Sequence, residues 1–504
     1  MTRLTVLAAL AAVGAAGFAG TAAADTLPEA LAAAYETNPQ LTVQRAIVRQ
    51  ADEGVPQALA NGRPTVNAVG VAQQSGNNFT RDGGRYYNGA LNLNQSLYRG
   101  GRTRSATSAA ENRILAARAR LRAVEDNVLL AVVTAYADVL RYMAVVELNE
   151  NQVKVLQREL QASRDRFEVG DLTRTDVAQS DARLANAQSN LVVAQGQLNT
   201  AKNAYLRVVG RSPVDLAPLP PLPVLPGTVG QATDLANANN PSLVAARFDE
   251  AAARYDVSTI ERQRLPTLEA GAGVNYTYTQ SGTAGFTTTS TGSTDTGTTG
   301  SSAIGTGASG GSSVVSGNFH AFQQTAGLTL TVPLYQAGLN GSQIRAAQAV
   351  RSQYMEQIGF IGRQAVETAS NAFVSVATAR AVITASESSV KANQLALEGV
   401  TQENQVGTRT VLEVLNAEQE LVVARVNLAA ARRDEYVAGY TLLAAVGQAE
   451  ADPLAVPGEH FDSTENAARV RHKWGDYDID TDPAPLPLPD PVVASKSVAI
   501  GPPR

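Results

Sequence analysis

An internal duplication constrains the fold of this chain more than any other feature. Three dipeptides of the first half recur 237 positions later: Leu97-Tyr98 as Leu334-Tyr335, Val169-Gly170 as Val406-Gly407, and Val209-Gly210 as Val446-Gly447. About 113 residues therefore repeat without a net gap. We expect the two halves to fold into the same elements in the same order.

Upstream of these pairs the spacing falls to 202 positions, as between Asn38-Pro39 and Asn240-Pro241 or between Pro64 and Pro266. The difference lies in the stretch 281–317, which is almost wholly Gly, Ser and Thr. Such a segment cannot bury apolar area and predicts a flexible loop. The first repeat is assigned to 25–212, a Pro-rich linker to 213–227, the second repeat to 228–450 and a disordered tail to 451–504.

Each repeat is expected to contain a long helical hairpin. Proline is absent between Pro64 and Pro213 and between Pro333 and Pro453, so long uninterrupted helices are allowed. We predict helix, turn and helix over 102–168, 169–173 and 174–209, and again over 339–405, 406–410 and 411–446. Medium helices are expected over 41–62 and 243–264. At 1.5 Å rise per residue the longest helices span about 100 Å.

Apolar residues in the long helices recur with the three- and four-residue spacing of coiled coils. In the first repeat this row runs from Val132 to Leu160, with Glu150 and Gln157 as polar interruptions. Glu387 and Gln394 interrupt the matching row of the second repeat. An ordinary coiled coil describes this packing, but the polar breaks indicate a wider and partly wet assembly.

Four stretches alternate apolar and polar residues with the period of a β-strand. The four stretches are 64–76, 90–98, 266–280 and 326–335. The first two form the strand pair 64–98, and the last two form the strand pair 266–335. Stretch 64–76 alternates least clearly. Strands of this length, apolar on one face and rich in Asn and Thr on the other, fit a membrane barrel. A half-buried soluble sheet gives the same alternation.

Tyrosines mark two levels along these strands. Tyr98 and Tyr335 end one side, whereas Tyr276 and Tyr278 lie towards the other. Because tyrosine gathers where a membrane meets water, this placement predicts two aromatic girdles.

Four strands cannot close a barrel, and open sheet edges are not stable in hydrocarbon. The chain is therefore expected to share strands with copies of itself. Two copies would give eight strands filled by side chains, and three would give twelve strands around a lumen.

The N-terminus and the composition narrow the possible functions. Residues 1–24 hold Arg3, an apolar stretch and Ala22-Ala23-Ala24, the order of a cleaved secretory signal, with an uncleaved anchor as the alternative. After residue 25 the sequence contains no run of 18 apolar residues, so we expect no further transmembrane helix. The net charge of −5 and the lack of a basic stripe argue against nucleic acid as a partner. Cysteine is absent and the three histidines are scattered, so we expect no enzyme, no metal site and no cofactor.

The order of these elements, and the sequences of the two hairpin turns, resemble the TolC family of outer-membrane channel-tunnels. The turn sequences are VGDLTRTDVAQSDAR from Val169 and VGTRTVLEVLNAEQE from Val406, and the resemblance covers about 25–450. It implies an α+β membrane protein, a homotrimer with a 12-strand β-barrel and an α-helical tunnel through the periplasm. It also implies efflux or type I secretion, with a periplasmic adaptor and an inner-membrane ABC or RND transporter as partners. The tail would then lie in the periplasm.

The turns also carry the candidate site residues. Gly170 and Gly407 allow a tight helix reversal, and Thr173 or Thr175, and Thr408 or Thr410, are possible caps of the next helix. The resemblance implies that the adaptor docks at the two turns, through Val169, Gly170, Val406 and Gly407. It also implies that Arg409 bonds Thr175 and Asp176 and that Glu413 forms an acidic ring. Asn404 and Asn416 depart from the family's tyrosine and second acid, so we expect fewer tethers and a less negative ring.

Two further hypotheses stay open. A periplasmic coiled-coil structural or adaptor protein without a barrel is the alternative function. Arg99, Arg102 and Arg104 cluster where strand becomes helix. They are interpreted as ordinary solvated charges, with headgroups of the inner leaflet as the other possibility.

Overall fold

The computed structural model describes residues 25–76, 83–170, 172–281 and 318–481. They belong to two compact units. The helical unit contains the described residues within 25–53, 112–251 and 352–481, and the strand unit contains those within 54–111 and 252–351. The predicted signal segment 1–24, the low-complexity loop from residue 282 to 317 and the end of the tail, 482–504, lie outside the described residues.

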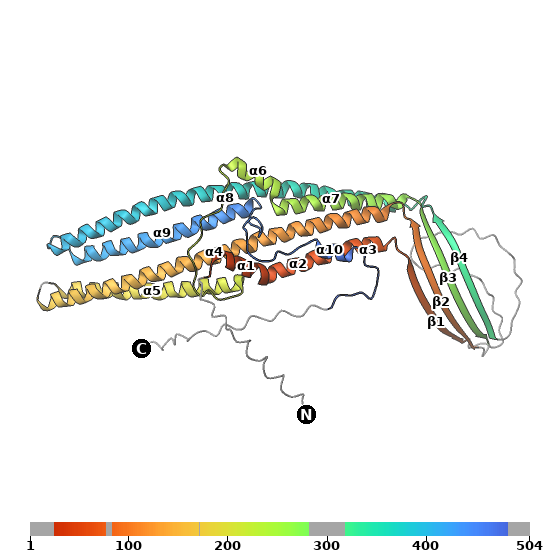
Figure 1. Cartoon of the computed structure of the whole chain (residues 1–504), viewed down its shortest axis with the longest axis horizontal. Coiled ribbons are helices and arrows are strands. Elements are labelled where there is room, and N and C mark those ends of the chain that lie inside the picture. Colours follow the sequence, from red (N-terminus) through yellow and green to blue (C-terminus); the bar gives the residue numbers. More distant parts are fainter. Residues whose placement is uncertain (1–24, 77–82, 171, 282–317, 482–504) are drawn as a thin grey trace, which may run out of the picture. The chain divides into compact units, whose positions relative to one another are not determined.

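The strand unit is built on one antiparallel sheet in the order β1-β2-β3-β4 (Figure 1). Its strands are β1 Thr65–Gly76, β2 Gly83–Tyr98, β3 Thr267–Ser281 and β4 Asn318–Thr331. β2 and β4 begin seven or eight residues earlier than the sequence alternation predicted, because their first halves alternate less clearly. β4 also ends before Val332, so Tyr335 lies beyond the sheet.

The strand register places the apolar residues on one face of the sheet. Leu93 lies opposite Val66 on β1 and Ala272 on β3, and Leu268 lies opposite Leu330. The other face is polar, and Asn88 on it donates hydrogen bonds from Nδ2 to Asn275 Oδ1 at 2.6 Å and to Thr277 Oγ1 at 3.1 Å. The expected two-faced alternation is therefore present in the register.

Each strand pair leads into a long helix through the same backbone turn. Gly100 and Gly101 have φ values of 63° and 77°, and Ala337 and Gly338, 237 positions later, have 48° and 81°. At Gly100 a Cβ atom would lie 2.7 Å from the Cβ of Leu265, so only glycine fits there.

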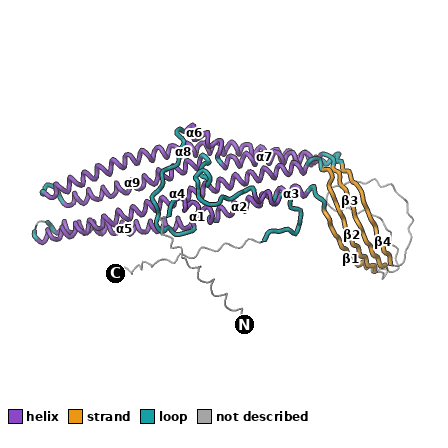
Figure 2. The backbone as a smooth tube through the Cα atoms, viewed as in Figure 1, coloured by secondary structure: helices purple, strands orange, loops and turns teal. Residues whose placement is uncertain are grey.

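The helices lie in the order that the sequence predicted (Figure 2). Their bounds are α1 Leu27–Thr37, α2 Pro39–Asp52, α3 Gly54–Ala60, α4 Arg102–Glu168, α5 Arg174–Val209, α6 Val229–Asn239, α7 Pro241–Glu261, α8 Leu339–Gln405, α9 Val411–Ala445 and α10 Glu465–Val470, with a 3₁₀ turn η1 at Arg262–Arg264. The medium helix expected over 41–62 is divided into α2 and α3 next to Gly54. Gly54 and Pro56 explain the break, because both residues weaken a helix interior.

The centre of α4 forms the main core of the helical unit. Val128, Leu129, Val132 and Val139 are fully buried there. Tyr136 is also buried and donates hydrogen bonds from its hydroxyl to the carbonyl oxygens of Asp25, at 2.8 Å, and Ala217, at 2.7 Å. Of the described helices, α4 alone is long and apolar enough to cross a membrane, and half of its apolar window is buried inside the protein. This window supplies packing for the helical unit.

The buried row of α4 follows the predicted seam only in part. Val132, Val139, Val153 and Leu160 are buried, whereas the seam positions Glu150 and Gln157 are exposed. Other side chains take their place in the interior: Val145, Gln152 and Leu156.

The expectation of a disordered tail is wrong for residues 451–481. Ala451 and Val456 are buried in the main core, and Val470 at the end of α10 is also buried. Phe461 donates a backbone hydrogen bond of 3.1 Å to the hydroxyl of Tyr35. The Nδ2 of Asn466 donates a hydrogen bond of 2.8 Å to Asp52 Oδ2. A few apolar side chains hold this segment against the core. The sequence alone did not indicate them, because the acidic, Pro-rich stretch that follows dominates the composition of the tail.

Candidate functional site: the two hairpin tips

The first tip reverses the chain between α4 and α5. Val169 is 80% exposed, and Gly170, with φ 83°, takes the left-handed conformation that ends a helix tightly. Thr173 caps α5, since its Oγ1 accepts from the Asp176 N–H at 3.3 Å while Asp176 Oδ2 accepts from the Thr173 N–H at 3.0 Å. Of the two possible caps, Thr173 is the one used, and Thr175 is exposed.

The second tip repeats this arrangement between α8 and α9. Val406 is 76% exposed and Gly407 has φ 81°. The Thr410 N–H donates 2.9 Å to Glu413 Oε2, and Thr410 Oγ1 accepts from the Glu413 N–H at 3.4 Å. Thr410 is therefore the cap. Thr408 instead donates its hydroxyl to the carbonyl oxygen of Glu403 at 2.9 Å.

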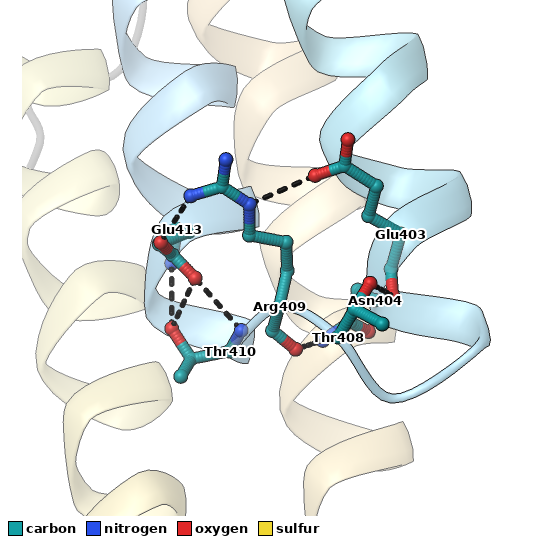
Figure 3. Close-up of polar contacts among 6 residues, drawn as sticks. All are labelled: Glu403, Asn404, Thr408, Arg409, Thr410 and Glu413. Atoms are coloured by element: carbon teal, nitrogen blue, oxygen red, sulfur yellow. Dashed lines mark hydrogen bonds and ion pairs between the residues drawn. The ribbon is translucent and has the colours of Figure 1, made fainter.

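Arg409 has a different environment from the one that the resemblance implied. Its Nε donates a hydrogen bond of 2.8 Å to Glu403 Oε2 on α8, and its Nη1 donates one of 2.7 Å to Glu413 Oε1 on α9 (Figure 3). No described bond joins it to Thr175 or Asp176, since Asp176 is engaged by Thr173. Within one chain the expected link from Arg409 to the first tip is not formed, and Arg409 fastens the two arms of its own hairpin.

Hydrogen bonding sets the charge of the two tip acids. The Thr173 hydroxyl and N–H donate to Asp176 and lower the pKa of its carboxyl. The backbone N–H of Thr410 and the guanidinium of Arg409 lower the pKa of Glu413. Both acids are therefore ionised at neutral pH. Glu413 shares one cation with Glu403, so the second tip has a local surplus of one negative charge.

The two departures from the family pattern, Asn404 and Asn416, both form bonds. Asn404 donates from Nδ2 to the carbonyl oxygen of Arg409 at 2.8 Å and so closes the second turn. Asn416 Oδ1 accepts a hydrogen bond of 2.6 Å from Nη2 of Arg183 on α5. This bond connects the hairpin of the first repeat to that of the second. Glu403 and Arg183 were missed in the sequence, because charged side chains on exposed helix faces carry no signal without their partners.

A small apolar cluster lies under this polar layer. Leu415 on α9 is buried with Val153 and Leu156 on α4 and Ala187 on α5. The second hairpin therefore packs against the first close to both tips.

The predicted girdle residues divide into two groups. Tyr278 stacks on Tyr87 with ring centroids 5.9 Å apart, and a hydrogen bond of 2.8 Å joins the Tyr276 hydroxyl to Nδ1 of His320. Tyr98 is the last residue of β2, and Tyr335 lies past the end of β4 and is 87% exposed. The first group forms one aromatic cluster, and the second lies at the opposite ends of the strands.

Comparisons with known proteins identify the family. A family model described as outer membrane efflux protein matches residues 30–211 and 232–448. The outer membrane efflux protein BepC of Brucella suis is 31% identical over 456 residues, which cover 90% of this chain and 92% of BepC. This chain belongs to the outer membrane efflux protein family.

Other matches agree with that family. The alkaline protease secretion protein AprF of Pseudomonas aeruginosa is 26% identical over 364 residues, covering 70% of this chain and 68% of AprF. Proteins named TolC are also among its relatives, so the resemblance to the TolC family is confirmed. The solved CmeC outer membrane channel of Campylobacter jejuni has the same fold, with a TM-score of 0.68 at 14% identity over 88% of this chain and 89% of CmeC.

Family membership confirms the outer membrane as the location and an efflux-type duct as the function. The alternative of a periplasmic coiled-coil protein without membrane strands is wrong, because the outer membrane family model spans both repeats. The relatives are channel proteins, which supports a role without catalysis.

Proposed function

We propose that three copies of this chain close a 12-strand barrel in the outer membrane and form a passive exit duct. The sheet itself carries this proposal. No described strand pairs with the outer edge of β1 or of β4, and hydrocarbon does not tolerate unpaired backbone edges. Pairing β4 of one copy with β1 of the next removes every open edge.

The exposed apolar face supports contact with lipid. Leu91 is 50% exposed, and Leu328 and Leu330 are 68% and 64% exposed, although apolar side chains of this size are usually buried. Tyr98 lies opposite Leu268 at one end of β3, and Tyr278 lies ten residues further along that strand. Ten residues of strand extend about 33 Å, and a tilt near 40° reduces this to about 25 Å, the height of an apolar barrel band.

The polar face favours three copies over two. An eight-strand barrel is filled by its own side chains, whereas this face presents Asn88, Asn275, Thr277 and the carboxylate of Glu269. Such side chains need water in front of them. Twelve strands provide that lumen.

The long hairpins would extend the duct through the periplasm. In each repeat the hairpin ends in an exposed Val-Gly turn, Val169-Gly170 and Val406-Gly407, which we assign to docking of a periplasmic adaptor. An inner-membrane ABC or RND transporter, the partner that the family resemblance implies, would supply the energy. Drugs, a secreted protein or both would be the cargo. BepC is named an efflux protein and AprF an alkaline protease secretion protein, so both kinds of transport are represented among the relatives.

The gate is assigned to Thr175, Asp176, Arg409, Glu413 and Asn416. Of these, Asn416 makes the bond between hairpins within a subunit, while Arg409 and Glu413 stiffen the second tip. Asp176 fixes the start of α5, and Thr175 remains exposed for contact with a neighbouring subunit.

The mass of the detergent-extracted, unheated complex tests this assembly. A trimer that conducts ions in planar bilayers is expected. A solitary, water-soluble chain without conductance would exclude the proposed duct.

A further inference from the structure

A cavity of about 680 Å³ opens in the strand unit where β2 ends and α4 begins. Its lining includes the apolar side chains of Leu97 and Tyr98, which are 54% and 51% exposed. Arg99, Arg104 and Glu111 are the charged residues that line it. Two guanidiniums against one carboxylate leave the lining positive.

The duplication provides an internal comparison for these arginines. The second repeat makes the same strand-to-helix turn, with matching positive φ values at Gly100 and Ala337 and at Gly101 and Gly338. In that repeat Gln336 and Gly341 occupy the positions of Arg99 and Arg104, 237 residues later. Since the turn forms without arginines there, the turn does not explain why they are present in the first repeat.

The two guanidiniums are held differently. Arg99 is half-buried and donates from Nη1 to the carbonyl oxygen of Asn61 at 2.6 Å, which fixes it at the cavity wall with its other donors available. Arg104 is exposed and has no hydrogen-bond or ion-pair partner among the described residues. Guanidinium groups with available donors bind phosphate through paired, charge-assisted hydrogen bonds.

We propose that this cavity binds the phosphate headgroup of a glycerophospholipid, one in each subunit. Arg99 and Arg104 hold the phosphate, and the acyl chains lie along Leu97, Tyr98 and the apolar face of the sheet that continues from them. This inference rests on the proposed barrel, which places the α4 end of β2 at the periplasmic surface of the outer membrane. The lipid therefore comes from the periplasmic leaflet.

Native mass spectrometry of the purified complex, with phosphatidylglycerol, phosphatidylethanolamine or inorganic phosphate added, tests the inference. We expect bound phospholipid in the wild type and a loss of affinity of about tenfold or more in Arg104→Gln, since a charge-assisted contact is removed. Arg104→Lys keeps the charge and should restore most of the binding. Arg345→Gln is the matched control, because Arg345 is an exposed arginine of the strand unit outside this cavity.

The double variant Arg99→Gln/Arg104→Gln should retain no phospholipid while staying a conducting oligomer. Equal lipid retention in wild type and variants would overturn the inference and leave the duct intact. Binding of inorganic phosphate without lipid would show a free-anion site instead. Loss of assembly with unchanged lipid binding in Arg104→Gln would show that a neighbouring subunit covers the cavity. A wild type that is absent from the outer membrane would contradict the proposed function itself.

Discussion

Arg183 on α5 donates a hydrogen bond of 2.6 Å to Asn416 on α9. The bond joins the hairpin of the first repeat to that of the second near both tips, where the resemblance had implied a link from Arg409. Separating the two hairpins breaks this bond, whereas the bonds of Arg409 stay within one hairpin. Arg183 and Asn416 are therefore the pair whose loss should open the tip.

We expect Arg183→Ala and Asn416→Ala to raise single-channel conductance and vancomycin entry. An exposed bond to a charged donor contributes about 1 kcal/mol, which changes the ratio of closed to open tips about fivefold. Asn416→Asp should act in the opposite direction, because it turns the bond into an ion pair. Arg164→Ala is the control, since Arg164 pairs with Asp181 only across the first hairpin. If all four variants conduct like the wild type, Arg183 and Asn416 do not take part in the gate.

Ion selectivity tests the charge of the second tip. Arg409 neutralises part of the charge of Glu403 and Glu413, so Arg409→Ala should raise the preference for cations. Glu413→Gln removes a negative charge and should lower it. Reversal potentials in a potassium chloride gradient measure both changes. Shifts of the same sign in the two variants would contradict the arrangement in Figure 3.

The cap of α5 predicts a difference between two neighbouring threonines. Thr173→Ala removes the side chain that accepts from the Asp176 N–H and should destabilise the first tip by about 1 kcal/mol. Thr175→Ala, at an exposed position outside the capping box, should leave stability unchanged. Limited proteolysis at the turn compares the two, and faster cleavage in Thr175→Ala would reverse the assignment.

The sequence was sufficient to predict the repeats, the long hairpins and the two faces of the sheet, because each depends on a period that a single chain displays. Leu93 and Leu268 could be placed on the apolar face before their partners were known. The partners of charged residues could not be predicted in this way. Arg409 has carboxylates at positions 403 and 413 within reach, and only the conformation of the turn shows that it binds both.

The ordered part of the tail shows a second limit of the sequence. Val456 ends a run of only three apolar residues, Leu454-Ala455-Val456, and Val470 lies between two arginines, so neither displays a helical or strand period. Val456 is buried in a core cluster that includes residues of α1, α2 and α4, more than 300 positions earlier in the sequence. Next to Val470, Asn466 bonds Asp52 of α2. Composition averaged over 451–504 therefore predicted disorder for the whole segment.

His460 makes the attachment of this segment depend on pH. Its Nδ1 lies 2.5 Å from Asp452 Oδ1 and its Nε2 lies 3.0 Å from the carbonyl oxygen of Val456. The Val456 carbonyl and then Asp452 favour the charged ring and raise the pKa of His460. This stabilisation is complete below the ordinary pKa of histidine, near 6.5, and is lost as pH rises through the higher folded value.

We therefore expect amides of 451–461 to exchange with solvent more readily at pH 8 than at pH 6, after correction for intrinsic rates. His460→Ala should remove the difference. His472→Ala is the control, because His472 is exposed further along the tail. If His460→Ala keeps the pH dependence, another group holds the segment.

Asp126 on α4 predicts a second pH effect, on global stability. Its carboxyl is buried with Oδ1 unpartnered. Burial, followed by the charges of Glu450 and Glu125, raises its pKa to about 8, against the opposing effect of Arg122. Between pH 4 and 8 the folded chain therefore holds a proton that the unfolded chain has lost, so the free energy of unfolding falls as pH rises.

Asp126→Asn should raise the melting temperature at pH 8 and flatten its fall between pH 5 and pH 8. The gain is on the order of a few kcal/mol, because each pKa unit corresponds to about 1.4 kcal/mol. Asp234→Asn, at an exposed aspartate of the same unit, should leave the profile unchanged. Thermal unfolding in detergent at both pH values gives the comparison. A pH profile of Asp126→Asn that matches the wild type would show that Asp126 is ionised in the folded protein.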